Sequence, residues 1–173
     1  MLTILPLLPD SEHIHAARAL YERAFPENER RDFDDMLHDA SGICDLATVL
    51  NDGRFCGFAC TLVCLNIAHI IYFAVEEKLR GKGIGSSILH HLHDRYAPMR
   101  VIVDIERCGI LYPDNAQRTA RKAFYQRAGY TENPVFYRWQ DEDYEVLSFS
   151  GGITYQEFCD FWHEAYTKNP NIG

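Results

Sequence analysis

Residues 80–86 read RGKGIGS and combine residue types that bind phosphate groups. Gly81, Gly83 and Gly85 lack a Cβ, so the backbone can approach a ligand closely and its N–H groups can face outward. The first amides of a helix have no intrahelical acceptor, and the helix dipole adds positive potential there. Because an apolar strand pattern precedes this loop and a helical pattern follows it, the expected ligand is a diphosphate at a helix N-terminus.

Two common phosphate-binding motifs do not fit the glycine spacing. A Walker loop requires Gly-Lys followed by Ser or Thr, whereas Lys82 is followed by Gly83. A dinucleotide fingerprint requires Gly-x-Gly-x-x-Gly, which the spacing Gly81-x-Gly83-x-Gly85 does not give. An ordinary glycine-rich turn between strand and helix is the structural alternative. The pattern Arg-x-x-Gly-x-Gly that begins at Arg80 resembles the acyl-CoA pyrophosphate loop of the GNAT superfamily of N-acyltransferases.

Residues 116–130, AQRTARKAFYQRAGY, form a second candidate motif. Small and aromatic apolar residues recur there at helical spacing, and Gly129 marks the end of the helix. The ending Phe124-Tyr125-x-x-x-Gly129-Tyr130 resembles the GNAT helix whose tyrosine faces the sulfur of CoA. A core aromatic residue with a satisfied hydroxyl is the structural alternative for Tyr125.

The resemblance implies acetyl-CoA as co-substrate, without a metal. Arg118 and Arg121 on the second motif could face this negative ligand, although the family often has Asn and Ala at these two positions. The residues expected to contact the cofactor are Phe73, Val75, Arg80, Gly81, Lys82, Gly83, Ile84, Gly85, Ser86, Arg118 and Arg121.

The reaction that the resemblance implies is attack of an amine on the acetyl thioester, which has three requirements. The amine must lose a proton, because an alkylammonium with a pKa of about 10.4 is no nucleophile at neutral pH. The oxyanion needs a fixed donor, and the departing thiolate needs a proton or a hydrogen bond. By the resemblance, Tyr125 protonates the thiolate, a backbone N–H near Phe73 faces the oxyanion, and Val75 lies toward the pantetheine.

Two residues are candidates for the base. Glu106 ends an apolar strand, residues 100–106, whose alternation places Asp104 and Glu106 on one face. His69 lies eleven residues before Arg80, a spacing at which some histone-acetylating members of the family carry a glutamate. Each has a structural alternative, since Glu106 could pair with an arginine and His69 could be a satisfied core histidine. Water alone could also relay the proton.

The acceptor side of the cleft is expected near the N-terminus. Ser11 is a favoured N-cap for a helix through about Phe25, and a polar loop and a short helix at about 32–38 follow. GNAT-like proteins build the acceptor side from such a pair of helices, so Glu29 and Arg30 are candidates for substrate contacts. A solvated charged turn is the alternative.

The order of elements resembles the GNAT topology over nearly the whole chain. The fold expected is α/β (α+β): a mixed, mostly antiparallel sheet of about seven strands, flanked by helices, with a splayed cofactor strand. A single domain over residues 1–173 is expected. The remaining strands are predicted at 2–8, 44–50, 54–65, 68–75, 135–139 and 144–150, and the remaining helices at 83–96 and 155–166, the last with a Thr154–Glu157 capping box.

Cysteine and histidine clusters give no ready metal site. Cys56, Cys60 and Cys64 have an even spacing, which predicts one strand face and small buried thiols rather than a zinc site. The histidines at 90, 91 and 93 point to different sides of one helix, where a solvated face is expected.

Composition limits the classes of partner. The net charge of −8 argues against nucleic acid or an anionic membrane and favours a cationic acceptor. The N-terminus reads as a strand rather than a signal peptide, and no apolar run is long enough to span a membrane, so a cytoplasmic location is expected. The sequence leaves open whether the chain forms a homodimer.

Three functions remain in competition. The first is an acetyl-CoA-dependent N-acetyltransferase that acts on a primary amine of a small molecule or peptide. The second is a non-catalytic acyl-CoA-binding sensor or interaction module. The third is a nucleotide-binding domain, against which the glycine spacing argues.

Overall fold

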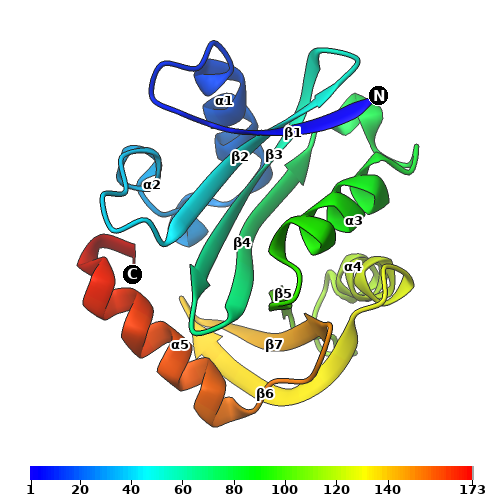
Figure 1. Ribbon diagram of the computed structural model, residues 1–173. Coiled ribbons are helices and arrows are strands. Elements are labelled where there is room, and N and C mark those ends of the chain that lie inside the picture. Colours follow the sequence, from blue (N-terminus) through cyan, green and yellow to red (C-terminus); the bar gives the residue numbers. More distant parts are fainter. Residues whose placement is uncertain (173) are drawn as a thin grey trace.

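The computed structural model describes residues 1–172, which are built around one sheet of seven strands (Figure 1). The strand order is β1-β2-β3-β4-β5-β7-β6, and every neighbouring pair is antiparallel except β4 and β5. The expected mixed, mostly antiparallel sheet is therefore confirmed. The strands are β1 (Leu2–Pro6), β2 (Cys44–Asn51), β3 (Arg54–Cys64), β4 (Ile67–Val75), β5 (Arg100–Glu106), β6 (Thr131–Trp139) and β7 (Glu142–Phe149).

β4 and β5 run together only over their first residues. Their parallel pairing covers Ile67–Ile70 against Arg100–Val103 and then ends. A bulge at Ile71, in the pairing of β4 with β3, coincides with this end, and bulges bend the strand that carries them. Beyond the bulge β4 continues along β3, while β5 continues along β7. The two strands therefore diverge, which confirms the prediction of a splayed cofactor strand.

Helices cover both faces of the sheet (Figure 1). α3 (Ile84–Tyr96) and α4 (Asn115–Arg127) pack on one face, over a core that includes Leu92 and Val103. α1 (Ile14–Ala24), α2 (Phe33–Leu37) and α5 (Tyr155–Lys168) cover the other face. Alternation along β3 divides its side chains between the two layers, with Phe58 facing α1 and Ala59 facing α3.

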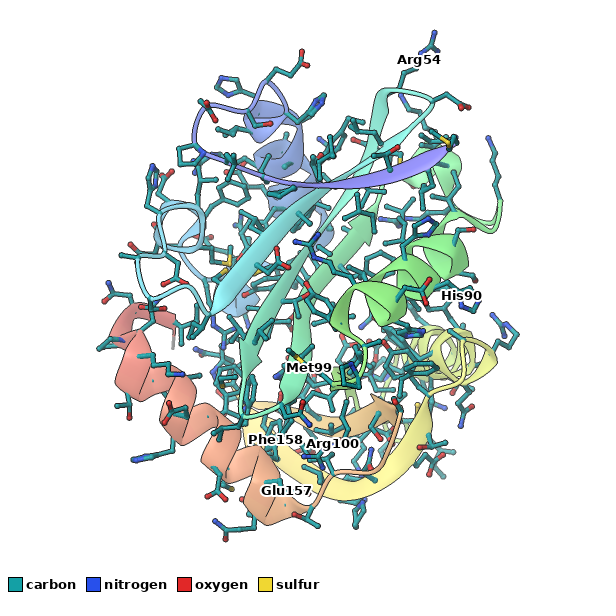
Figure 2. All side chains as sticks on the ribbon, in the orientation of Figure 1. Arg54, His90, Met99, Arg100, Glu157 and Phe158 are labelled. Atoms are coloured by element: carbon teal, nitrogen blue, oxygen red, sulfur yellow. The ribbon has the colours of Figure 1, made fainter. Side chains whose placement is uncertain are left out.

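The predicted capping box fixes the start of α5. Thr154 Oγ1 accepts from the Glu157 backbone N–H at 3.2 Å, and the Glu157 carboxylate accepts from the Thr154 N–H at 2.8 Å. Arg100, at the beginning of β5, donates to Glu157 at 2.8 Å, and Figure 2 labels both residues. This ion pair links α5 to β5, one of the two strands that diverge.

The start of α1 differs from the sequence-based prediction. The helix begins at Ile14 rather than directly after Ser11. Ser11 Oγ accepts from the His13 N–H at 3.2 Å within a preceding turn, and no side chain caps the helix. Serine side chains stabilise local turns as well as helix N-termini, and here Ser11 stabilises the turn before the helix instead of capping the helix.

The prediction that Cys56, Cys60 and Cys64 share one strand face is wrong. The pairing of β2 with β3 shifts between Val49 and Leu50, which leaves Cys56 unopposed in a bulge. Cys56 therefore packs with the α3 layer, whereas Cys60 packs with the α1 layer. All six cysteines are free thiols.

His93 does not belong to a solvated helix face. It is 6% exposed, its ring stacks on Phe149 at 3.6 Å between centroids, and its Nε2 lies 3.1 Å from the Tyr130 hydroxyl. His90 and His91 are exposed, as expected for that helix face. Burial, with a smaller contribution from His90, lowers the pKa of His93 from 6.5 to about 4.

His93 should make the fold sensitive to acid. Between pH 6.5 and about 4 the unfolded chain binds a proton at this ring and the folded chain does not, so the free energy of unfolding falls as pH is lowered. The loss attributable to His93 is about 3 kcal/mol across that range. In urea titrations at pH 7 and pH 4.5, His93→Gln should lose less stability on acidification than the wild type or the control His91→Gln. Equal losses in all three proteins would contradict the assignment.

Gly57 should be required for the close approach of β3 to β4. A Cβ at this position would lie 2.5 Å from the Ala74 carbonyl oxygen. Gly57→Ala should lower the free energy of unfolding by about 1–3 kcal/mol, because backbone must shift to admit the methyl group. The matched control is Gly152→Ala, whose Cβ meets nothing closer than 3.4 Å and which should change stability by less than about 1 kcal/mol. Similar denaturation midpoints for both variants would refute this reading.

Candidate active site

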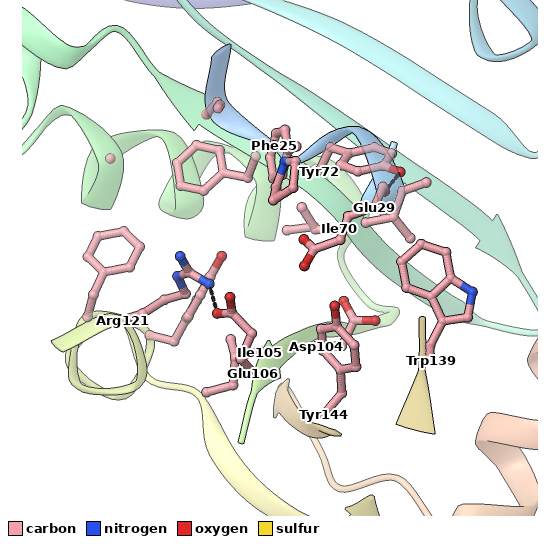
Figure 3. Close-up of a pocket in the computed structure, with 18 of the residues that line it drawn as sticks. Phe25, Glu29, Ile70, Tyr72, Asp104, Ile105, Glu106, Arg121, Trp139 and Tyr144 are labelled. Atoms are coloured by element: carbon pink, nitrogen blue, oxygen red, sulfur yellow. Dashed lines mark hydrogen bonds and ion pairs between the residues drawn. The ribbon is translucent and has the colours of Figure 1, made fainter. Parts of the chain in front are cut away.

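A cavity of about 1080 Å³ lies where β4 and β5 diverge (Figure 3). Its walls include Ile70–Val75 of β4 and Asp104–Glu106 of β5. The start of α3 and one side of α4 line one end, and the loop before α2, the β6–β7 hairpin and α5 line the other. The cavity therefore connects the glycine loop with the region where the acceptor side was expected.

The glycine loop presents unpaired amides at the first end. Gly81 and Gly83 adopt φ values of +73° and +79°, in the left-handed region that favours glycine, and Gly83 is the N-cap of α3. The first helical N–H with a backbone acceptor is that of Ser87, which donates to Gly83 O at 3.1 Å. Within residues 1–172 the amides of residues 81–86 have no hydrogen-bond acceptor. Such a row of outward N–H groups at a helix N-terminus is an anion site.

The diverging half of β4 has backbone groups that point away from β3. Glu76 N–H donates to Cys56 O on β3 at 2.9 Å. Because successive residues of a strand direct their N–H and C=O groups to opposite sides, those of Phe73 and Val75 point away from β3. Arg80 Nε donates to Val75 O at 3.1 Å, which agrees with this direction. β5 pairs no further than Ile70, so the Phe73 N–H faces the cavity without a strand partner.

Tyr125 meets the cavity from α4. Its side chain is 9% exposed, and its hydroxyl has no protein partner in the described chain yet is not sealed from the cavity. Burial raises the pKa of Tyr125 to about 12, against a smaller lowering by Arg121. The phenol is therefore protonated at neutral pH and free to donate a hydrogen bond.

Two carboxylates face the same space in the middle of the cavity, those of Glu29 and Glu106 (Figure 3). Glu106 Oε2 accepts from Arg121 Nη1, which leaves Oε1 without a partner in the described chain. Glu29 belongs to no ion pair among residues 1–172. Burial, and then the charge of Glu106, raise the pKa of Glu29, while the Tyr144 hydroxyl acts in the opposite direction. A cation would relieve the repulsion between the two carboxylates.

His69 lies behind the cavity wall rather than in it. The residue is 0% exposed, its Nε2 lies 3.3 Å from Asp104 Oδ1, and aromatic rings of α5 surround it. The other oxygen of Asp104 accepts from the Tyr137 hydroxyl. Burial acts to raise the pKa of Asp104, but His69 and Tyr137 outweigh it and hold the pKa below its usual value. His69 is a buried core histidine, as the structural alternative proposed, but neither ring nitrogen makes a hydrogen bond within the described residues. Because the ring is fully buried, direct contact between His69 and an acceptor is not supported.

Most of the predicted cofactor residues share one end of the cavity, and five of the predicted site residues, His69 among them, do not line it. The predicted residues that line the cavity are Glu29, Phe73, Val75, Arg80, Gly81, Gly83, Gly85, Ser86, Glu106, Arg121 and Tyr125. Lys82 and Ile84 belong to the loop but not to the wall, and Arg30 lies outside it. Arg118 is 5% exposed and bonded to Asp114 and Glu142, so it is a structural residue rather than a cofactor contact.

Sequence reasoning missed several residues of the second end. Asp104 shares its strand face with Glu106, and this alternation could have identified Asp104 as a residue of the site. Arg31 follows Arg30 in the charged loop, and nothing in the sequence indicates which of the two arginines faces the cavity. The aromatic wall draws on distant segments, and its members are Phe25, Tyr72, Tyr137, Trp139, Tyr144, Phe158, Trp162 and Tyr166.

Neither a metal site nor a membrane span is found in the described part of the chain. Residues 1–172 contain no cluster of three or more His, Cys, Asp or Glu side chains placed to hold a metal ion. None of the helices in this range has the length and hydrophobicity that crossing a bilayer requires.

Comparison with known proteins assigns the family. A sequence model of the acetyltransferase (GNAT) domain matches residues 44–132, just over half of the chain. The chain belongs to the GNAT acetyltransferase family. The matched segment contains both GNAT motifs, the glycine loop and the helix that carries Tyr125. A search of curated proteins gives no match.

Solved structures share the GNAT fold at low sequence identity. A GNAT-family protein from Bacteroides thetaiotaomicron is 20% identical, with 99% of each chain covered and a TM-score of 0.78. The ribosomal-protein-S18-alanine N-acetyltransferase of Escherichia coli is 20% identical over 89% of this chain and 96% of that one, with a TM-score of 0.62. An aminoglycoside 6′-N-acetyltransferase complexed with coenzyme A is 14% identical over 85% and 96%, with a TM-score of 0.65.

Arg118 and Arg121 should respond differently to the same substitution. Arg118 bonds Asp114 and Glu142 at 2.8 Å each and stacks over Tyr112, whereas Arg121 is 41% exposed with one ion pair. Arg118→Gln should lower the free energy of unfolding by about 2 kcal/mol, because the buried guanidinium's two carboxylate pairs and its packing over Tyr112 are lost. Arg121→Gln should cost less than about 1 kcal/mol. Chemical denaturation of both variants tests this, and a larger loss for Arg121→Gln would contradict the structural role of Arg118.

Proposed function

We propose that the protein transfers the acetyl group of acetyl-CoA to a primary amine by direct attack. The observation that carries this proposal is the meeting, in one cavity, of an unpaired amide row at residues 81–86 with the free hydroxyl of Tyr125. The first feature suits a diphosphate, and the second suits a leaving thiolate. The family assignment and a matched structure with bound coenzyme A support the same donor.

The glycine loop and β4 would hold the donor. The amides of residues 81–86 bind the pyrophosphate, with Arg80 beside them, and the exposed backbone of Val75 and Phe73 accompanies the pantetheine toward Tyr125. Gly85 is needed in this arrangement for a second reason, because a Cβ there would lie 3.2 Å from the Phe124 ring. That ring stacks on Phe73 at 6.4 Å between centroids.

The transfer step assigns a role to each unpaired group. The amine nitrogen forms a bond to the thioester carbonyl carbon, and the Phe73 N–H donates to the oxygen on which negative charge develops. The carbon–sulfur bond then breaks, and Tyr125 gives its proton to the departing thiolate. The phenol, whose pKa burial raises to about 12, is fully protonated when the sulfur departs, and the tyrosinate left behind takes up the proton that the amine releases.

The acidic pair would receive the amine. An ammonium entering between Glu29 and Glu106 neutralises two carboxylates that repel each other. Glu106 is the proposed base, through Oε1 and directly or by way of a water molecule, since Arg121 bonds only its other oxygen. Glu29, on the facing wall of the cavity, positions the ammonium beside Glu106.

A non-catalytic acyl-CoA sensor is the second candidate, and the same donor end would serve it. The open Tyr125 hydroxyl and the acidic pair favour catalysis, because a protein that only binds the coenzyme needs neither. The test is an amine panel assayed for CoA release with purified protein, alongside coenzyme binding by calorimetry. Coenzyme binding with no release from any amine would favour the sensor.

Tyr125→Phe should lower kcat by about 100-fold or more, because the general acid is lost while the ring remains. Affinity for coenzyme A should stay within about twofold, since the hydroxyl contacts only the sulfur in this mechanism. The matched control is Tyr130→Phe, whose hydroxyl lies against His93 rather than in the cavity. A kcat within about threefold of wild type for Tyr125→Phe would remove Tyr125 from the mechanism.

A further inference from the structure

The loop that carries Glu29 is clamped at its backbone by two tyrosine hydroxyls. The Tyr72 hydroxyl donates to Glu29 O at 2.7 Å and accepts from the Arg31 N–H at 3.0 Å. The Tyr21 hydroxyl donates to Arg31 O at 2.9 Å. Both tyrosines are buried, so the turn from Glu29 to Arg31 is fixed and its side chains start from defined positions. Glu29 and Arg31 both line the cavity.

The Arg31 guanidinium is placed with most of its donors unused. It lies between Trp139 and Trp162, with its central carbon 5.4 Å and 5.3 Å from the two ring centroids. Nε donates to Ile172 O, and Nη1 lies 3.4 Å from the Tyr72 hydroxyl. A guanidinium has five N–H donors, so three remain without a partner in residues 1–172. Nη2 is not sealed from the cavity.

No carboxylate of the described chain pairs with this cation. Asp104 is an acidic group whose charge acts on Arg31, but its two oxygens are directed to His69 and Tyr137. A partly buried charge without a paired counter-charge is costly, and a planar guanidinium fork matches a carboxylate with two parallel hydrogen bonds. The cation lies over the rings of Trp139 and Trp162 and Nε is bonded to Ile172 O, which leaves donors of Nη1 and Nη2 for a ligand.

The cavity between the two charged positions is aromatic. In the view of Figure 3, Glu29 and Tyr144 lie between Glu106 on one side and Trp139 on the other. Tyr72 and Phe25, whose rings contact at 4.9 Å, form part of the same wall. A molecule that spans this space meets carboxylates near the donor end, apolar rings along its body and a guanidinium at the far end.

We propose that the acceptor is a primary amine that also carries a carboxylate, with an apolar body, and that Arg31 binds this carboxylate. The inference rests on the proposed function and names its substrate class: an amine whose carboxylate lies at the opposite end of an apolar body, as in an ω-amino acid. The ammonium lies by Glu29 and Glu106, and the carboxylate lies against Nη1 and Nη2 of Arg31. A diamine or an aminoglycoside would instead bring a second cation toward Arg31 and leave its donors unpaired.

Matched acceptors test the inference on the wild-type enzyme. 4-(Aminomethyl)benzoate is compared with benzylamine, and 6-aminohexanoate with pentylamine, because only the carboxylate differs within each pair. The value of kcat/KM should be about 10-fold or more higher for the carboxylated member, as expected for hydrogen bonds to a charged group. Equal values, or a preference for the amines without a carboxylate, would overturn the proposal.

Substitution then assigns the preference to Arg31. Arg31→Gln should lower kcat/KM for 4-(aminomethyl)benzoate about 10- to 100-fold and change that for benzylamine by less than about threefold. Arg31→Lys, which keeps the charge but loses the fork, should fall between wild type and Arg31→Gln. Arg18→Gln, on α1 and outside the cavity wall, is the control. A folded Arg31→Gln protein that loses both acceptors equally would refute the anchor.

Direct binding separates failure of this inference from failure of the proposed function. If no amine releases CoA, the proposed transfer fails, and calorimetry on the wild-type protein loaded with coenzyme A still compares 4-(aminomethyl)benzoate with benzylamine. Tighter binding of 4-(aminomethyl)benzoate would support the carboxylate anchor. Equal or weaker binding would overturn the anchor. The anchor would also be overturned if CoA were released equally well from amines with and without a carboxylate.

Discussion

The site depends on the divergence of two parallel strands after four paired residues. β4 and β5 share hydrogen bonds only up to Ile70 and Val103, and each then follows another neighbour. Backbone groups in a sheet normally find partners, so the free N–H of Phe73 is retained only because the divergence leaves a cavity beside it. Packing keeps the strands apart: the Phe73 and Phe124 rings stack beside Gly85, at the start of α3. The cavity is therefore part of the fold rather than a gap in it.

Charge is distributed unevenly along this opening. Backbone amides and Arg80 make one end positive, while Glu29, Asp104 and Glu106 make the middle negative. Arg121 contacts Glu106 between the two regions and reduces the repulsion among the acids. An overall charge of −8 is thus compatible with an anionic donor, because local amides and two arginines counteract it at one end. Residues far apart in sequence produce this local pattern.

Sequence analysis was most successful where the interactions are local. The glycine conformations at 81 and 83, the capping box at Thr154 and the alternation along β5 each depend on a few neighbouring residues. The errors arise where a distant partner decides. Arg118 has the same type and helix as Arg121, and only the position of Glu142 makes it structural. Contacts that no spacing in the sequence specifies produce the two bulges of β3 and β4. Such contacts also place His93 against Phe149 and His69 behind Asp104.

Neighbouring residues of β4 face opposite layers of the molecule. Tyr72 packs with α1 and fixes the loop from Glu29 to Arg31, whereas Phe73 packs toward α3 and α4. One strand therefore supports the glycine-loop end of the cavity and the proposed acceptor region through side chains that do not share a core. During evolution, the loop on the Tyr72 side could acquire new side chains and new acceptors while the donor region kept its shape. Diversification of substrate choice under a constant chemistry is the expected history of such an architecture.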